Sequence, residues 1–122
     1  MKDSKLIDSS VWIVYLFNGR YCEVIDSNDI LLLSTLSLFE IKKKLVKSKV
    51  EENKIIKSIE FIKKRSLLVP VTIEIAEKAV DFSLDNKLPI IDALIYTTSV
   101  ANESTLITID NDFRGLKNVI VL

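Results

Sequence analysis

Two carboxylates directly follow the stretch of the chain that most resembles a buried strand. Thr105–Ile109 is mostly apolar and rich in β-branched residues, which favours a strand in the core. Asp110 and Asp112 come directly after it. In open α/β sheets, ligands bind at the carboxyl ends of the strands. Because an isolated charge is costly to bury, the chemistry of this edge depends on which other acids reach it.

Three further acids are expected at the same edge. Asp8 ends the short first strand, Glu40 lies near the start of the helix after the second strand, and Asp92 lies in the first turn of a later helix. Carboxylates that converge on one cleft repel each other, so they stay ionised only around a cation, or else their pKa values rise. Oxygen ligands without His or Cys select Mg²⁺ or Mn²⁺, and those ions usually act on phosphates.

Each acid also has a purely structural interpretation. Asp8 can cap the helix that follows it, and Ser37–Glu40 matches a capping box in which the Glu side chain reaches back to the Ser amide. Asp92 can stabilise the positive end of its helix dipole. Asp110 and Asp112 can form an Asx-turn or a cap. Taken one acid at a time, both interpretations stay open.

The composition removes several classes of chemistry. The 122 residues contain no His, which excludes His-based acid–base catalysis, Ser-His-Asp triads and His metal ligands. The single Cys, Cys22, forms no internal disulfide and no thiolate zinc site, and a free thiol is typical of the reducing cytoplasm. Basic and acidic residues number 17 each, which argues against indiscriminate binding to nucleic acid or membrane. No apolar stretch has the length of a membrane span, and Met1–Lys5 lacks a signal-peptide core.

Apolar runs of strand length alternate with amphipathic segments along the chain. The predicted strands are Lys5–Asp8, Ile30–Leu33, Ser66–Val69, Thr105–Ile109 and Asn118–Leu122. The predicted helices are Val11–Phe17, Cys22–Ile25, Ser34–Lys49, Glu51–Arg65, Thr72–Asn86 and Ile90–Asn102, with a turn or short helix at Phe113–Leu116. This order predicts one domain over residues 1–122, of the α/β class, in which helices cover both faces of a parallel sheet.

The acids lie in four motifs that together resemble those of PIN-domain ribonucleases, and most closely the VapC-type toxins of toxin–antitoxin pairs. The resemblance covers nearly the whole chain. In chain order the motifs are Leu6-Ile7-Asp8-Ser9-Ser10-Val11, Ser37-Leu38-Phe39-Glu40-Ile41, Asp92-Ala93-Leu94-Ile95 and Thr108-Ile109-Asp110-Asn111-Asp112-Phe113.

The resemblance implies a fold, an activity and partners. The implied fold is a PIN-like three-layer α/β/α arrangement around a five-stranded parallel sheet. The implied activity is an endoribonuclease that depends on Mg²⁺ or Mn²⁺, acts on tRNA or another structured RNA, and arrests growth. A cognate antitoxin would occlude the site, and the toxin would form a homodimer. By analogy, the metal-binding catalytic quartet would be Asp8, Glu40, Asp92 and Asp110, supported by Asp112, Thr108 and Ser10.

Positive charge is concentrated in the middle of the chain, where an RNA strand could bind. Residues 42–65 carry ten of the 17 basic side chains and three acids. Lys43, Lys44 and Lys47 share the Glu40 face of their helix, so they are candidates for phosphate contacts. The alternative is a solvated helix face. The apolar stretches Leu31–Ile41 and Val11–Phe17 likewise have two interpretations, as core or as a surface for a homodimer or antitoxin helix.

Two rival functions use similar residues. A catalytically inactive PIN-like module would keep the acids for folding or for binding RNA or protein, and would bind no Mg²⁺ or Mn²⁺. A phosphotransfer domain would need a second acid beside Asp8, where the chain has Ser9-Ser10, or an Asp after the third strand, where it has Val69-Pro70-Val71. The sequence therefore favours the metal-dependent nuclease.

Overall fold

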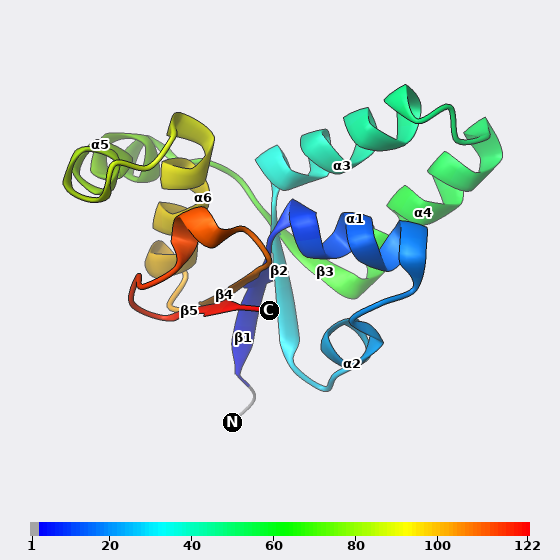
Figure 1. The fold of residues 1–122 in the computed structure, drawn as a ribbon, viewed down its shortest axis with the longest axis horizontal. Coiled ribbons are helices and arrows are strands. Elements are labelled where there is room, and N and C mark those ends of the chain that lie inside the picture. The colour runs from blue at the N-terminus through cyan, green and yellow to red at the C-terminus, as the bar shows by residue number, and fades with distance from the viewer. Residues whose placement is uncertain (1–2) are drawn as a thin grey trace.

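A parallel sheet of five strands forms the centre of the molecule (Figure 1). The computed structural model describes residues 3–122. The strands are β1 (Ser4–Ile7), β2 (Ile30–Ser34), β3 (Ser66–Val69), β4 (Thr105–Thr108) and β5 (Val119–Val121). They lie in the order β3-β2-β1-β4-β5, and every neighbouring pair is parallel. This confirms the predicted sheet, and it puts β1 at the centre, between β2 and β4.

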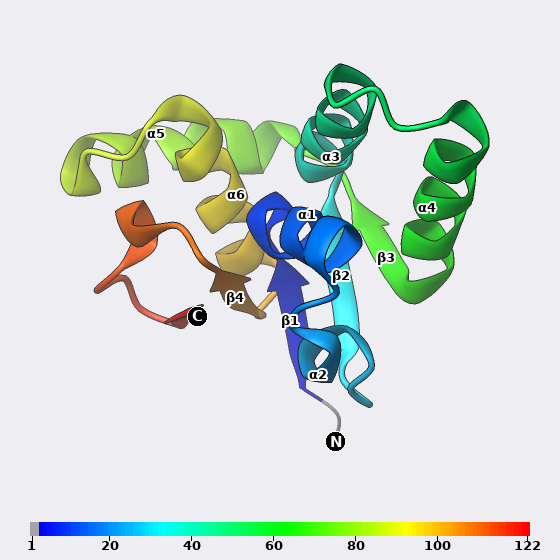
Figure 2. The ribbon, with the colours of Figure 1, turned by 45° about the vertical axis from the view of Figure 1, so that its right-hand side comes forward.

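Helices connect the strands and cover both faces of the sheet (Figure 2). They are α1 (Ser9–Asn18), α2 (Cys22–Ile25), α3 (Thr35–Lys47), α4 (Glu52–Arg65), α5 (Ile73–Asn86) and α6 (Ile90–Ala101), with a 3-10 turn η1 (Asn111–Phe113). The predicted three-layer α/β/α architecture is thereby confirmed. Among residues 3–122, no helix combines the length and apolarity needed to cross a membrane.

Alternate residues of the central strands point into two separate cores. Ile7 and Ile107 pack with α1, α3 and α4, whereas Leu6 and Leu106 pack with α5 and α6. This is the period-two alternation of a strand covered on both faces, which explains why neighbouring residues of these strands are both apolar. The double burial fixes the strand register, and with it the position of the residues that follow each strand.

The aromatic residues of α1 belong mainly to the core between α1 and α4. Trp12 is fully buried, and its ring meets those of Tyr15 and Phe61 edge-on at 5.8 and 6.2 Å between centroids. Phe17 lies nearer the end of the helix and is 44% exposed. The core interpretation of this stretch is therefore correct for Trp12. Gly19 adopts a left-handed conformation (φ 67°) that ends the helix, a conformation that glycine takes readily.

One side chain fastens the end of α4 to the loop before β2. The Arg65 guanidinium donates to the carbonyl oxygens of Ile25 and Ser27 at 2.6 and 2.8 Å. Arg65 is the last residue of α4, so these bonds hold the helix against the loop that leads into β2. The α3–α4 pair is thus anchored at the far end from the predicted site.

Candidate active site

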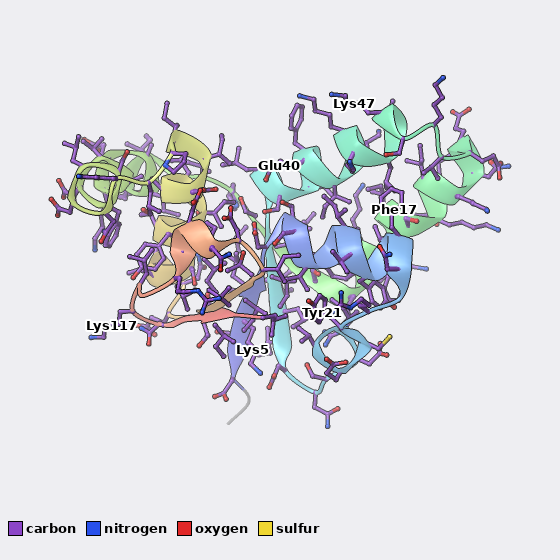
Figure 3. The ribbon with its side chains drawn as sticks, in the orientation of Figure 1. Lys5, Phe17, Tyr21, Glu40, Lys47 and Lys117 are labelled. Atoms are coloured by element: carbon purple, nitrogen blue, oxygen red, sulfur yellow. The ribbon has the colours of Figure 1, made fainter. Side chains whose placement is uncertain are left out.

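The predicted acids come together at the carboxyl ends of the three central strands. β1 leads directly into Asp8, and Asp110 follows two residues after β4. Glu40 lies in the second turn of α3, which begins where β2 ends, and Figure 3 places it on the part of α3 nearest the sheet. Asp92 lies in the first turn of α6. The negative charges of all the other four acids, Asp110, Asp8, Asp112 and Glu40, act on Asp92.

Three of these acids form the tightest group. One carboxylate oxygen from each of Asp92, Asp110 and Asp112 lies within 4.8 Å of the other two. Burial, followed by the charges of the neighbouring carboxylates, raises the pKa of Asp92 to about 6. Mg²⁺ and Mn²⁺ prefer carboxylate oxygens as ligands. The residues present therefore fit a divalent cation, and the group includes Asp112, for which only a supporting role was predicted.

Two hydroxyl groups hold the Asp8 carboxylate in place at the site. Asp8 is 7% exposed, and its Oδ2 accepts hydrogen bonds from Ser10 Oγ and Thr108 Oγ1, both at 2.8 Å. Burial raises the pKa of Asp8 despite these two bonds, and the nearby charge of Asp110 acts in the same direction. Both hydroxyls use the same carboxylate oxygen, so Oδ1 takes no part in these bonds.

The same two hydroxyl groups tie the end of β4 to the start of α1. Thr108 Oγ1 accepts from the amide of Asp110 at 3.0 Å, and Ser10 Oγ accepts from the amide of Ile109 at 3.3 Å. The Asp8 carboxylate and the loop that carries Asp110 are thus fixed relative to each other by Thr108 and Ser10. These contacts are consistent with the predicted supporting positions of both residues.

The structural interpretations of Asp110 and Asp8 have different outcomes. Asp110 Oδ1 accepts from the amide of Asp112 at 2.9 Å and so caps η1, as one interpretation predicted. This bond also orients Asp112 beside Asp110, so a capping role and a place in the acidic group coexist. Asp8 occupies the cap position of α1 but makes no side-chain capping bond. The capping interpretation of Asp8 is therefore wrong.

The capping-box interpretation of Ser37–Glu40 is also wrong. α3 begins at Thr35, and its cap is Ser34, whose Oγ accepts from the amide of Leu36 at 3.1 Å. Glu40 is therefore free to face the site, where its Oε1 accepts from Ser9 Oγ at 3.2 Å. Burial and the charge of Asp8 raise the pKa of Glu40. The prediction gave no role to Ser9, although a hydroxyl residue directly after the first acid was a usable signal.

A groove runs along α3 away from the acids. Its lining includes Ser9 and Glu40 at the site and then Lys43, Lys44 and Lys47, and it encloses about 460 Å³. Figure 3 shows Glu40 and Lys47 along the same helix, with Lys47 further from the sheet. The three lysines that the sequence placed on the Glu40 face therefore do line one groove with Glu40.

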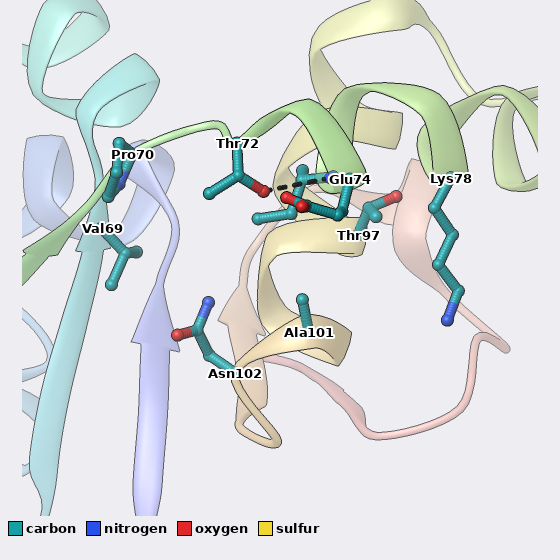
Figure 4. Close-up of a pocket in the computed structure, with 9 residues that line it drawn as sticks. Val69, Pro70, Thr72, Glu74, Lys78, Thr97, Ala101 and Asn102 are labelled. Atoms are coloured by element: carbon teal, nitrogen blue, oxygen red, sulfur yellow. Dashed lines mark hydrogen bonds between the residues drawn. The ribbon is translucent and has the colours of Figure 1, made fainter.

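A second hollow of about 410 Å³ lies between the end of β3, α5 and α6 (Figure 4). It contains none of the predicted site residues. Thr72 in its wall accepts from the amide of Ile75 at 3.2 Å and so caps α5, which accounts for its hydroxyl. Glu74 and Lys78 are solvent-exposed side chains at its margin. Its polar groups therefore have structural roles or face water.

Solved structures with the same fold come from several organisms. A chain of the toxin–antitoxin complex from Klebsiella pneumoniae is 22% identical, with a TM-score of 0.78 and 96% of each chain covered. A chain of VapBC-1 from nontypeable Haemophilus influenzae is 18% identical, with a TM-score of 0.78, 98% of this chain covered and 96% of the other. The sarcin-ricin loop cleaving toxin VapC20 of Mycobacterium tuberculosis is 13% identical, with a TM-score of 0.67, 89% of this chain covered and 92% of the other.

Sequence comparison extends the likeness to a family. No curated protein matches the chain at a significant level. The family model described as the PIN domain, however, matches residues 5–119. That range includes Asp8, Glu40, Asp92, Asp110 and Asp112, and it spans the sheet from β1 to the first residue of β5. The chain therefore belongs to the PIN domain family.

Proposed function

We propose that this protein is an endoribonuclease that depends on Mg²⁺ or Mn²⁺ and is the toxin of a type II toxin–antitoxin pair. The proposal is carried by the convergence of five carboxylates at one sheet edge, three of them with oxygens within 4.8 Å of one another. The PIN domain match and the toxin–antitoxin structures among its structural neighbours support a toxin nuclease role.

The carboxylates of the site would bind the cation, and the hydroxyl groups around them would position the carboxylates. Asp8, Glu40, Asp92 and Asp110 would hold the cation, and the position of Asp112 supports adding it to this set. When bound, the cation would polarise the phosphate and make water a stronger nucleophile. The chain has no His, so a carboxylate of the site would serve as the acceptor for the proton of the attacking water.

The hydroxyl groups around the acids would set their geometry. Thr108 and Ser10 both donate to Asp8 Oδ2 and would hold this carboxylate in place at the end of β1. Ser9 donates to Glu40 and would hold that carboxylate toward the centre. Such fixed orientation lowers the cost of assembling ligands around an ion, so we assign positioning roles to these hydroxyls.

The RNA strand would approach along the groove on α3. Lys43, Lys44 and Lys47 line the groove with Glu40, so phosphates bound by these lysines would lie next to the acids. The substrate would be tRNA or another structured RNA, met in the cytoplasm.

Two protein partners complete the proposal. A cognate antitoxin would cover the acids and the α3 groove, as the family resemblance implies. A second copy of the chain would cover the exposed apolar face of α5 and α6. That face includes Ile73, Val80, Leu84 and Ile90, each more than half exposed. An apolar surface of this kind at the junction of two helices is typical of a protein interface.

The test is cleavage of RNA by purified protein with added Mn²⁺. Asp92→Asn should abolish cleavage and leave the circular dichroism spectrum unchanged, because Asn is nearly the same shape but cannot supply the charge. Asp81→Asn, an exposed acid on α5, is the matched control and should cleave like the parent. An Asp92→Asn variant that cleaves at the parental rate, with contaminating nuclease excluded, would refute the proposal.

Calorimetry with Mn²⁺ separates this function from the inactive PIN-like module. The nuclease predicts a bound ion that is lost in Asp92→Asn. The inactive module predicts no binding to the parent, because its acids would serve folding or partner contacts alone.

A further inference from the structure

Phe39 is an aromatic side chain that the fold does not bury. It directly precedes Glu40 on α3 and is 66% exposed. The inward face of the same helix is formed by Ile41 and Leu45, which are buried, so the core is complete without the Phe39 ring. The Phe39 ring therefore stays largely in water, next to the acidic site.

The surroundings of Phe39 are cationic. Lys43 Nζ lies 5.9 Å from the centre of the Phe39 ring, within range of a cation–π contact. The ring lines the same groove as Glu40, Lys44 and Lys47. Lysines interleaved with an exposed aromatic ring are the features by which proteins hold single-stranded nucleic acid, with phosphates on the lysines and a base on the ring.

The charge of the groove favours a polyanion as its occupant. Lys43, Lys44 and Lys47 are the charged side chains of the groove apart from Glu40, and Glu40 belongs to the acidic site. Stacking also restricts the form of the nucleic acid, because the face of a base in a duplex is covered by its neighbours. The ring can therefore accept a base only from a loop, bulge or single strand.

We propose that Phe39 is a stacking platform for an unpaired base of the RNA beside the scissile phosphate, with Lys43, Lys44 and Lys47 holding the adjoining phosphates. This inference rests on the proposed nuclease function and adds a substrate feature to it. The protein would select unpaired segments over duplex, and the selection would come from one side chain that lines the groove beside Glu40.

Binding without divalent ions tests the inference separately from cleavage. In the Asp92→Asn background, with EDTA present, fluorescence anisotropy would measure the Kd for a short unstructured RNA and for an RNA duplex. Phe39→Ala should raise the Kd for the unstructured RNA about 5- to 150-fold and change duplex binding little. Phe39→Trp should restore the affinity. Ile56→Ala is the control, since Ile56 is an exposed apolar residue of α4 that does not line the groove.

The salt dependence and the base environment provide two further measurements. Lys44→Ala should reduce the slope of log Kd against log salt by about 0.7, whereas Phe39→Ala should leave the slope unchanged because it removes no charge. A 2-aminopurine base in the RNA should lose fluorescence on binding to the parent and keep it with Phe39→Ala.

Any of three results would overturn the inference. The Asp92→Asn protein could show no measurable RNA binding, or Phe39→Ala could leave the Kd unchanged. Phe39→Ala could also lose affinity equally for duplex and for unstructured RNA. If the Kd is unchanged in Phe39→Ala, the exposed ring would instead be a contact for a protein partner. Failure of the nuclease proposal is distinguishable, because Phe39-dependent binding would then occur with no cleavage by the parent in Mn²⁺.

Discussion

Removing the charge of Asp92 should stabilise the metal-free protein, although it should destroy the activity. The pKa of Asp92 is raised from 3.8 to about 6 by burial and by the carboxylates around it, with Asp110 the strongest of these. At neutral pH the folded chain must therefore ionise a group in a place that disfavours its charge. Asp92→Asn keeps the shape of the side chain and removes this cost.

The expected size of the effect follows from the pKa values. A rise from 3.8 to about 6 corresponds to a cost of about 3 kcal/mol above pH 6. Solvent screening of this partly exposed side chain reduces the cost to about 1.5 kcal/mol. The variant also loses the attraction between Asp92 and the positive end of α6, about 0.5 kcal/mol. The net gain is about 1 kcal/mol, or a Tm about 4 °C higher.

The direction in which stability changes with pH follows from the raised pKa of Asp92. Between about pH 4 and pH 6 the unfolded chain has released the Asp92 proton while the folded chain still holds it, so stability falls as the pH rises through this window. The advantage of Asp92→Asn should be absent at pH 4 and complete above pH 6.5. Thermal denaturation in EDTA at pH 4 and above pH 6.5 would measure this difference in stability between variant and parent. Asp81→Asn, at an exposed position, is the control.

Added Mn²⁺ should reverse the order of stability. An ion that binds only the folded state raises the Tm of the parent with concentration, whereas Asp92→Asn should respond weakly. The reasoning fails if Asp92→Asn is no more stable than the parent in EDTA at pH 7.5. It also fails if the difference in Tm is the same at pH 4.

Three other substitutions probe the hydroxyl network, the α4 anchor and the apolar face. Thr108→Val removes a donor to Asp8 and should lower the free energy of unfolding by about 1–3 kcal/mol; equal urea midpoints for variant and parent would contradict this. Arg65→Met breaks the bonds to the loop carbonyls around Ile25 and should cost about 2 kcal/mol by the same measurement, with cleavage retained. Leu84→Glu should convert a dimer to a monomer in sedimentation, and a parent that is already monomeric would refute the proposed second copy.

The sheet could be predicted from sequence because local signals at each strand agree. Ser66–Val69 has the predicted limits, since Arg65 ends one helix and Pro70 stops the strand. Most other limits shift by one or two residues, and the turn predicted at Phe113–Leu116 lies earlier, as η1 at Asn111–Phe113. Ser34 and Ser37 both suit the start of α3, and Ser34 is the cap because β2 delivers it, fully buried, to the edge of the sheet.

The acidic site was predictable for the same reason as the sheet. Asp8 and Asp110 follow neighbouring parallel strands, so correct strands place them together. The finer contacts could not be predicted, because they depend on side-chain directions across long separations. Ser9 reaches Glu40 only after α1 and α3 have packed, and Asp112 joins Asp92 only through the turn that Asp110 caps.

α5 shows why apolar spacing alone does not identify the buried face. Two apolar stripes run along this helix, and the larger, formed by Ile73, Ala76, Val80 and Leu84, is the exposed one. The buried stripe contains Ile75 and Ala79, and Ala79 packs in the same core as Ala93 of α6. Small side chains allow two helix axes to approach closely, so Ala79 and Ala93 favour this face for the contact between α5 and α6. The sequence pattern contains both stripes, and only packing against α6 decides between them. Because the chain buries the smaller stripe, the larger remains available to a second protein surface, which is the physical reason to expect an interface there.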